Sequence, residues 1–149
     1  MSIEIIDESG HGLDVKHLAA LSRFVMDEMR VHGLAELCIK AVDEATIAQL
    51  NEQWMEKEGP TDVLAFPMDE LRPGLINEEP EEGVLGDLVL CPAIAAAQGA
   101  SAGHGTLAEI ELLTTHGILH LLGYDHAEPE EHREMFALQD LLLDRWRTR

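Results

Sequence analysis

The sequence predicts an α+β fold, an α/β sandwich in which a mixed sheet of about four strands packs against helices. Three observations lead to this class. Short apolar runs alternate with helical patterns over the first hundred residues, whereas the last third of the chain carries helical patterns alone. The chain has 149 residues, of which 46% are hydrophobic, so residues 1–149 are expected to form a single globular domain.

Four apolar runs have the length and composition of strands, and turn-forming residues bound them. They cover residues 3–6, 35–42, 61–67 and 86–92. The second and third runs flank a helical segment. This arrangement predicts that they form a right-handed parallel crossover.

Five segments have helical periodicity and recognisable ends. The first runs from Asp14, a suitable N-cap, to about His32, with Gly33 just beyond its end. The second follows Asp43 and is expected to stop at Gly59. The others are expected over residues 92–99, 106–122 and, approximately, 129–146.

The charge is strongly acidic, with 29 Asp and Glu against 10 Lys and Arg and a formal net charge of −19. Such a balance argues against a general nucleic-acid binder, which usually presents a basic face. Much of the acid lies in residues 69–87, a predicted exposed loop, so the total does not describe any particular groove.

No apolar run approaches the roughly 20 residues that span a bilayer, and the N-terminus lacks a secretory pattern. We therefore expect a cytoplasmic protein with no membrane partner. Cys38 and Cys91 are expected to be reduced, and their separation disfavours a thiolate metal site.

Three histidines occur in the segment HGILHLLGYDH, residues 116–126. His116 and His120 are four residues apart and share one face of a helix. Gly123 can adopt positive φ and turn the chain, which would bring His126 toward the same point. Three neutral imidazoles suit one zinc ion per chain and leave a coordination position open. The alternative is that these histidines have ordinary packing roles.

The histidine and glycine spacing equals that of the metzincin peptidases, HExxHxxGxxH. Those enzymes need the glutamate beside the first histidine as a proton acceptor. Gly117 occupies that position here. The sequence therefore disfavours peptidase action.

The histidine segment resembles the signature of the YbeY family of bacterial metal-dependent endoribonucleases. Residues 50–67 and 85–92 resemble two further segments of that family, in the same order. The likeness covers about two-thirds of the chain, from Leu50 onward, and the N-terminal part matches in layout only. One departure is Met55, since family members commonly carry an arginine there that is proposed to act on RNA.

The resemblance implies a zinc-dependent endoribonuclease (a hydrolase and nuclease) with zinc held by His116, His120 and His126. It implies cleavage of single-stranded RNA, maturation of the 3′ end of small-subunit rRNA, and a part in ribosome biogenesis and quality control. The partners would be this RNA and the ribosome or its proteins; the oligomeric state stays open. Cleavage could use a metal-activated water or the ribose 2′-OH, and no general base is assigned. The alternative is a ribosome-assembly binding factor with a structural zinc and little nuclease activity.

A substitute for the missing arginine is predicted on the first helix. Lys16, Arg23 and Arg30 are seven residues apart and so lie along one side of that helix. The opposite side carries the apolar residues Leu18, Leu21, Val25 and Met29. The basic stripe would bind RNA phosphates beside the metal; the alternative is a solvated helix face.

Other polar and aromatic residues are weaker candidates. They have either structural roles or roles in the cleft, as ligand-orienting partners or as surfaces for base stacking. They are Trp54, Thr61, Asp62, Asp87, Tyr124 and Asp125.

Overall fold

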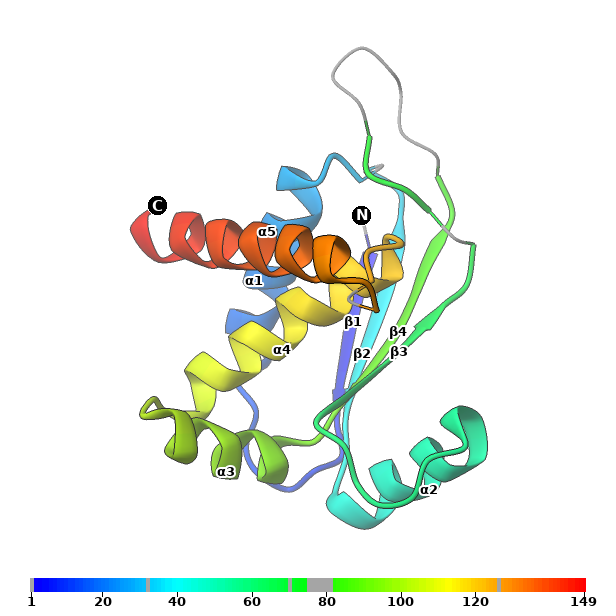
Figure 1. The fold of residues 1–149 in the computed structure, drawn as a ribbon, viewed down its shortest axis with the longest axis vertical. Helices are drawn as coiled ribbons and strands as arrows, with labels where there is room; N and C mark the ends of the chain where they lie inside the picture. Colours follow the sequence, from blue (N-terminus) through cyan, green and yellow to red (C-terminus); the bar gives the residue numbers. More distant parts are fainter. Residues whose placement is uncertain (1, 32, 70, 75–81, 126) are drawn as a thin grey trace.

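The computed structural model describes residues 2–31, 33–69, 71–74, 82–125 and 127–149. Within these residues it contains a four-stranded mixed sheet and five helices, which confirms the predicted α+β class (Figure 1). In chain order the elements are β1 (Ser2–Asp7), α1 (Val15–Glu28), β2 (Glu36–Ala41), α2 (Glu44–Met55), β3 (Val63–Pro67), β4 (Val84–Leu90), α3 (Pro92–Ala102), α4 (Thr106–Leu121) and α5 (Pro129–Thr148).

The strand order is β1-β2-β4-β3, with β1, β2 and β4 parallel and β3 antiparallel to β4 at the edge. The predicted parallel crossover from β2 through α2 to β3 is therefore wrong. The parallel crossover is instead β1–α1–β2. The alternation of strand and helix patterns is a poor predictor of which strands pair, because strand pairing depends on residues far apart in the chain.

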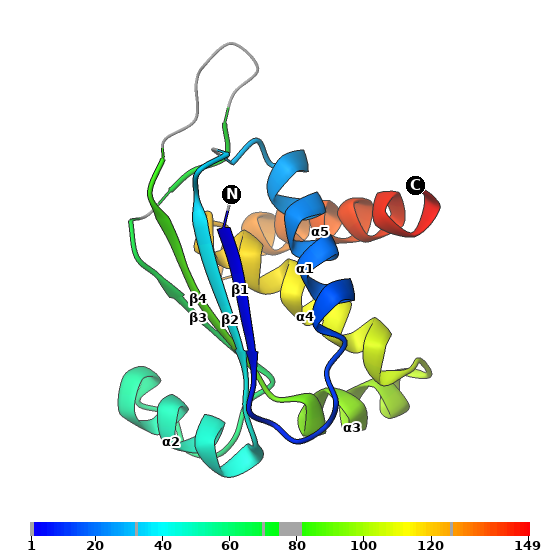
Figure 2. The same ribbon diagram turned by 180° about the vertical axis from the view of Figure 1, so that it is seen from behind.

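Helices α1 and α4 cover one face of the sheet, α5 packs on these two helices, and α2 lies on the other face (Figures 1 and 2). Successive β4 residues show this division. Leu88 and Leu90 belong to the large core under α1, α4 and α5, whereas Val89 packs with Ile47 of α2 and Leu64 of β3. Because strand side chains alternate between faces, one buried strand serves both layers.

Helix starts agree with the capping predictions. Asp14 accepts a hydrogen bond from the backbone N–H of His17 at 3.1 Å, and Asp43 accepts one from that of Thr46 at 2.8 Å. Helices α4 and α5 also lie close to their predicted bounds. Local side-chain chemistry therefore determined the starts of α1 and α2.

Three helix ends differ from the predictions. Helix α1 ends at Glu28, not near His32, which lies outside the described residues, and α2 ends at Met55 instead of residue 58. Arg30 and Glu56 each adopt φ of 55°, so a polar residue takes the left-handed conformation after each helix. Gly33 was expected to do so after α1, and Gly59, with φ of 85°, lies beyond the end of α2. Helix α3 continues three residues past its predicted end, to Ala102.

None of the helices in the described part of the chain is long and apolar enough to cross a membrane. Within the same residues both cysteines are free thiols, with Cys91 buried and Cys38 partly buried. Burial, with the charge of Asp87 and Glu4 as a smaller cause, raises the pKa of the Cys38 thiol.

Candidate metal centre

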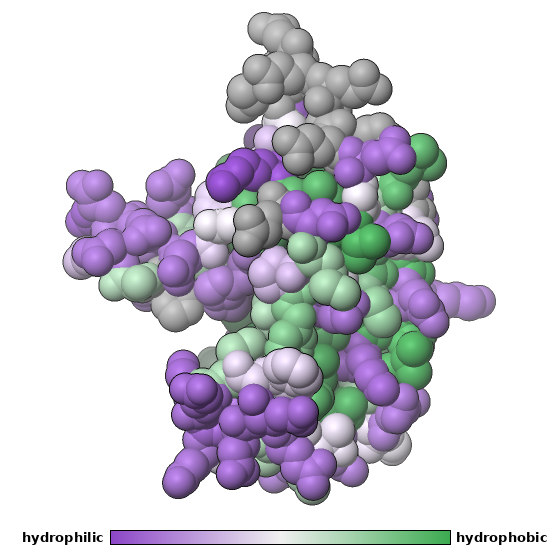
Figure 3. Space-filling view, turned by 90° about the vertical axis from the view of Figure 1, so that its right-hand side faces the viewer, coloured by the Kyte–Doolittle hydropathy of each residue, from purple (hydrophilic) through white to green (hydrophobic). Residues whose placement is uncertain are grey.

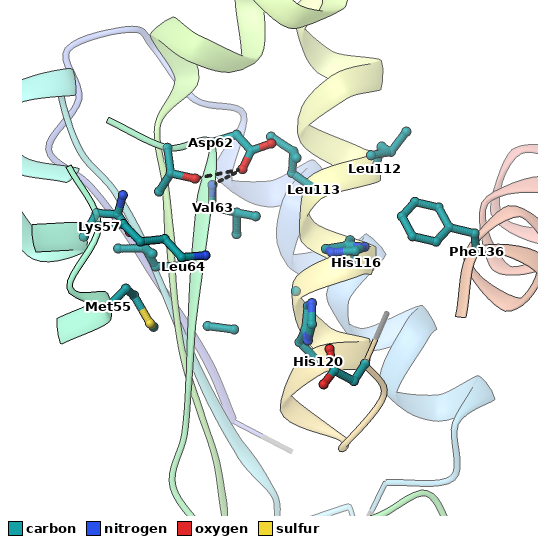
Figure 4. Close-up of a pocket in the computed structure, with 15 residues that line it drawn as sticks. Met55, Lys57, Asp62, Val63, Leu64, Leu112, Leu113, His116, His120 and Phe136 are labelled. Carbon is teal, nitrogen blue, oxygen red and sulfur yellow. Dashed lines mark hydrogen bonds between the residues drawn. The ribbon is translucent and has the colours of Figure 1, made fainter. Parts of the chain in front are cut away.

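One face of α4 opens onto a pocket beside the edge strand β3. Leu112, His116 and His120 are half-buried there, while most of their neighbours on the helix are buried. The pocket encloses about 610 Å³, in the range of small-molecule sites. In Figure 4 both histidines point into this space from α4, with Phe136 of α5 on one side and Met55 and Lys57 on the other.

The histidine pair is held in a defined arrangement. The ring centroids of His116 and His120 are 4.8 Å apart and the rings are nearly perpendicular, at 80°. The Nδ1 atom of His116 lies 2.8 Å from the Oε1 atom of Gln139, a buried residue of α5. An amide oxygen can only accept, so this contact makes Nδ1 the donor and leaves the lone pair on Nε2. In that tautomer the imidazole can bind a metal through Nε2.

The third predicted ligand, His126, lies outside the described residues. Among the described residues there is no group of three His, Cys, Asp or Glu side chains arranged to hold a metal ion. The chain does turn after α4 as predicted: Gly123 has φ of 99°, and the N–H of Tyr124 bonds to the carbonyl of Leu119 at 3.1 Å. Two imidazoles on one helix face, one oriented by a buried amide, fit a divalent metal such as zinc.

The structure explains why a glycine separates the paired histidines. A Cβ atom added to Gly117 would lie 2.6 Å from Cδ2 of Leu88, which is fully buried in β4. Helix α4 therefore packs closely on the sheet here, and a side chain at position 117 would require the buried Leu88 side chain to shift. A glutamate at position 117 would meet the core, which agrees with the argument against a peptidase.

Thr61, Asp62 and Asp125 line the pocket, as their cleft interpretation required. Asp62 also has a structural role, because its carboxylate accepts the N–H of Val63 at 2.7 Å and the hydroxyl of Thr61 at 3.3 Å. Asp87 lies on β4 and is absent from the residues that line the pocket, as far as the described chain extends.

The two aromatic candidates lie in different surroundings. Trp54 is 60% exposed on α2, so its ring is open to a stacking partner. Tyr124 packs against the core, and burial, with the charge of Glu134 as a smaller cause, raises its pKa.

The predicted basic stripe lies away from the pocket. Lys16 and Arg23 are exposed on α1, and Arg30 lies beyond the end of that helix, so the three do not form one helical stripe. None of them is among the described residues that line the pocket. Their contact with RNA remains a prediction.

A smaller pocket of about 260 Å³ lies on the other side of His120. It is bounded by Pro67, by Leu71 and Arg72 of the following loop, and by the end of α4. Figure 3 shows this side of the molecule, which is hollowed between hydrophilic lobes at the levels of α5 and α2 and has apolar residues beside the hollow.

The sequence analysis missed three polar residues here. Gln139 gave no signal, because a glutamine on an amphipathic helix is ordinary. Lys57 lies two residues after Met55, close enough in the sequence to indicate a substitute for the missing arginine. Arg72 is the one basic residue of the acidic segment 69–87, and this isolated positive charge was a signal for a binding role.

A four-stranded mixed sheet with a histidine pair in a pocket beside its edge defines a class, that of α+β proteins with a candidate metal centre. Comparison with known proteins narrows it. The family model described as "Endoribonuclease YbeY" matches residues 5–147. The chain therefore belongs to the YbeY family of endoribonucleases, enzymes that hydrolyse RNA. The match also extends the likeness, predicted to begin at Leu50, over nearly the whole chain.

Individual relatives agree with the family match. The chain is 85% identical over its full length to a protein named "Endoribonuclease YbeY" from Nocardioides sp., all of which it covers. It is 58% identical to a protein of the same name from Thermobifida fusca, over 99% of this chain and 95% of the relative. A solution structure from Thermotoga maritima has a TM-score of 0.66 and 28% identity, and the match covers 98% of this chain and 92% of that one.

Proposed function

We propose that the protein is a zinc-dependent endoribonuclease that cleaves single-stranded RNA and matures the 3′ end of small-subunit rRNA in the cytoplasm. Residues 1–149 act as one domain and bind one zinc ion. The ribosome or its proteins are partners, and the enzyme takes part in ribosome quality control. Membership of the YbeY family supports the reaction class.

His116, His120 and His126 would hold the ion. The observation that carries this proposal is the contact between His116 and Gln139, because it orients the His116 ring and leaves the lone pair on Nε2, through which an imidazole can bind a metal. When bound, the ion supplies Lewis-acid stabilisation of the charge that develops on a phosphoryl group.

The protein's own residues shape the reaction space. Helix α4 presents both described histidines on one face, and Gln139 holds the first of them. Leu112 and Phe136 form an apolar wall beside His116. The attacking group is a water molecule or the ribose 2′-OH, and no side chain is assigned as general base.

The test is cleavage of a defined single-stranded RNA by the metal-loaded protein and its His116→Ala variant. We expect the substitution to lower the rate by orders of magnitude while circular dichroism shows an intact fold. His11→Ala is the matched control, because His11 is exposed in the loop before α1 and should leave the rate unchanged. Equal cleavage by the His116→Ala variant would assign the activity to another site or a contaminant.

Product end groups extend the same experiment. A 2′,3′-cyclic phosphate would assign the attack to the ribose hydroxyl, and a 5′-phosphate beside a 3′-hydroxyl would assign it to water. Clean metal-loaded protein that binds RNA without cutting it would favour the second candidate, a ribosome-assembly factor. This second candidate is favoured by Met55, which lines the pocket at the position where the family resemblance implies an arginine that acts on RNA.

A further inference from the structure

We infer that Lys57 and Arg72 bind two phosphates of one RNA strand, on opposite sides of His120, so that the strand runs from the loop after α2, over the histidine pair, to the loop after β3. This inference rests on the proposed endoribonuclease function and specifies how that site takes its substrate. It replaces the α1 stripe as the principal RNA contact.

The first support is the relation between the two pockets. Among the described residues His120 alone lines both, so it bounds the space of about 610 Å³ and that of 260 Å³. A strand that occupied both spaces would therefore pass His120. A polymer bound in this way presents an internal bond, not a terminus, to the histidine pair, as an endonuclease requires.

The second support is the position of the two cations. Lys57 lines the larger pocket, and Figure 4 shows its side chain extending from the α2 side toward α4. Arg72 lines the smaller pocket, where its Nη1 atom would be 3.8 Å from a Cβ atom added to Gly123. Each pocket therefore holds one cation, and the two cations come from loops at either end of β3.

The third support is that four other cations are already engaged, while Lys16, Arg23, Arg30 and Arg133 are not among the described residues that line either pocket. Lys40, Arg145 and Arg147 form ion pairs with Glu8, Glu28 and Glu111 at 3.0, 2.9 and 3.4 Å. Arg149 lies over the ring of Trp146. In the described part of the chain Lys57 and Arg72 are the lysine and arginine that line these pockets, and neither forms an ion pair there.

The charge balance makes these two residues decisive. With a net charge of −19, the protein repels RNA at long range, so binding depends on cations placed where the backbone runs. Met55 lines the larger pocket without contributing charge. Lys57, two residues later, can supply a point charge to a phosphate, although not the paired hydrogen bonds of an arginine.

The test is binding of a labelled oligouridylate of about eight nucleotides to the metal-loaded full-length protein, followed by fluorescence anisotropy over a range of salt concentrations. Lys57→Met and Arg72→Met remove the charge but keep a flexible, unbranched side chain. Each should weaken binding about tenfold at low salt and take about 0.7 from the log–log salt slope. The double variant should lose both contributions.

Three controls sharpen the test. Lys40→Met removes an exposed charge that is paired with Glu8, away from both pockets, and should leave affinity and slope unchanged. Lys57→Arg keeps the positive charge and should bind RNA as the wild type does. Melting temperatures and zinc content should match the wild type, because both side chains are exposed. On longer RNA the loss should fall mainly on KM, as for uniform binding.

The outcomes separate the two proposals. Unchanged affinity and slope in both single variants, with the wild type still cleaving RNA, would overturn the strand path and leave the function standing. If Arg23→Glu weakens binding in their place, the α1 stripe is the RNA contact. A wild type that neither binds nor cleaves RNA when metal-loaded would overturn both proposals.

Discussion

At the scale of single residues, Gln139 decides how the candidate metal centre is built. Its Oε1 atom accepts from His116 at 2.8 Å, and its side chain is buried at the contact between α4 and α5. A neutral imidazole can bind a metal through only one nitrogen at a time. The residue that occupies the other nitrogen therefore sets both the tautomer and the ring orientation.

Replacement of Gln139 by leucine should weaken zinc binding about 10- to 100-fold, because His116 loses the acceptor that orients it. Competition with a chromophoric chelator measures this affinity. Gln139→Glu is the matched control, since a carboxylate also accepts from Nδ1 and should keep or raise the affinity. Equal zinc affinity in the leucine variant would show that His116 is oriented by other contacts.

At the scale of elements, one carboxylate joins three helices. Glu111 of α4 is buried and receives Nε1–H of Trp146 at 2.7 Å, with Nε2 of His17 at 2.9 Å and a guanidinium nitrogen of Arg147 at 3.4 Å. Burial raises the pKa of Glu111, but the hydrogen bonds from His17 and Trp146 and the charge of Arg147 outweigh it. The pKa therefore lies below its ordinary value of 4.5.

A lowered pKa in the folded state means that the charged carboxylate favours folding. This stability is fully present above about pH 4.5, the ordinary value, and is lost as the pH falls through the lower folded value. Glu111→Gln should therefore unfold about 1–3 kcal/mol more easily at pH 7. The difference from the wild type should shrink as the pH falls below that ordinary value.

Urea unfolding of both proteins between neutral and acid pH measures this difference. Glu28→Gln is a suitable control, because Glu28 also joins α1 to α5 but pairs with Arg145 at the surface, where such pairs contribute about 1 kcal/mol or less. A wild-type advantage that stays constant down to strongly acid pH would contradict the assignment to Glu111.

At the scale of the whole molecule, the pocket exists because α4, the edge strand β3 and the loop after α2 meet at the β3 edge of the sheet (Figure 4). The proposed ligands lie on α4 and in the segment after Gly123. A metal bound there would stabilise the folded molecule, because the unfolded chain does not hold the three imidazoles together.

Removal of metal with a chelator should therefore lower the melting temperature, and zinc should restore it. At a free zinc concentration of 100 times the dissociation constant, the gain is about 2.7 kcal/mol of unfolding free energy. The His120→Ala variant should show little response to zinc. A wild-type melting temperature that is the same with zinc and with chelator would argue against a zinc site of useful affinity.

The sequence alone was enough for features that depend on neighbouring residues. Asp14 and Asp43 cap helices because a carboxylate accepts from N–H groups three residues away. The shared face of His116 and His120 follows from helix geometry, and the turn follows from the freedom of Gly123 to adopt positive φ. The family resemblance has the same origin, since it rests on short segments in a fixed order.

Tertiary structure decided the features that join distant segments. Hydrophobic periodicity says that residues 61–67 form a strand, but not that β3 pairs antiparallel with β4 at the sheet edge. The neighbours of His120, among them Arg72, depend on that pairing, as does the approach of Lys57 to α4. The contact of Gln139 with His116 spans 23 residues and needs α5 to pack on α4. These contacts arise only when the chain folds, because side-chain chemistry predicts what a residue can bind but not which distant residue packing will bring to it.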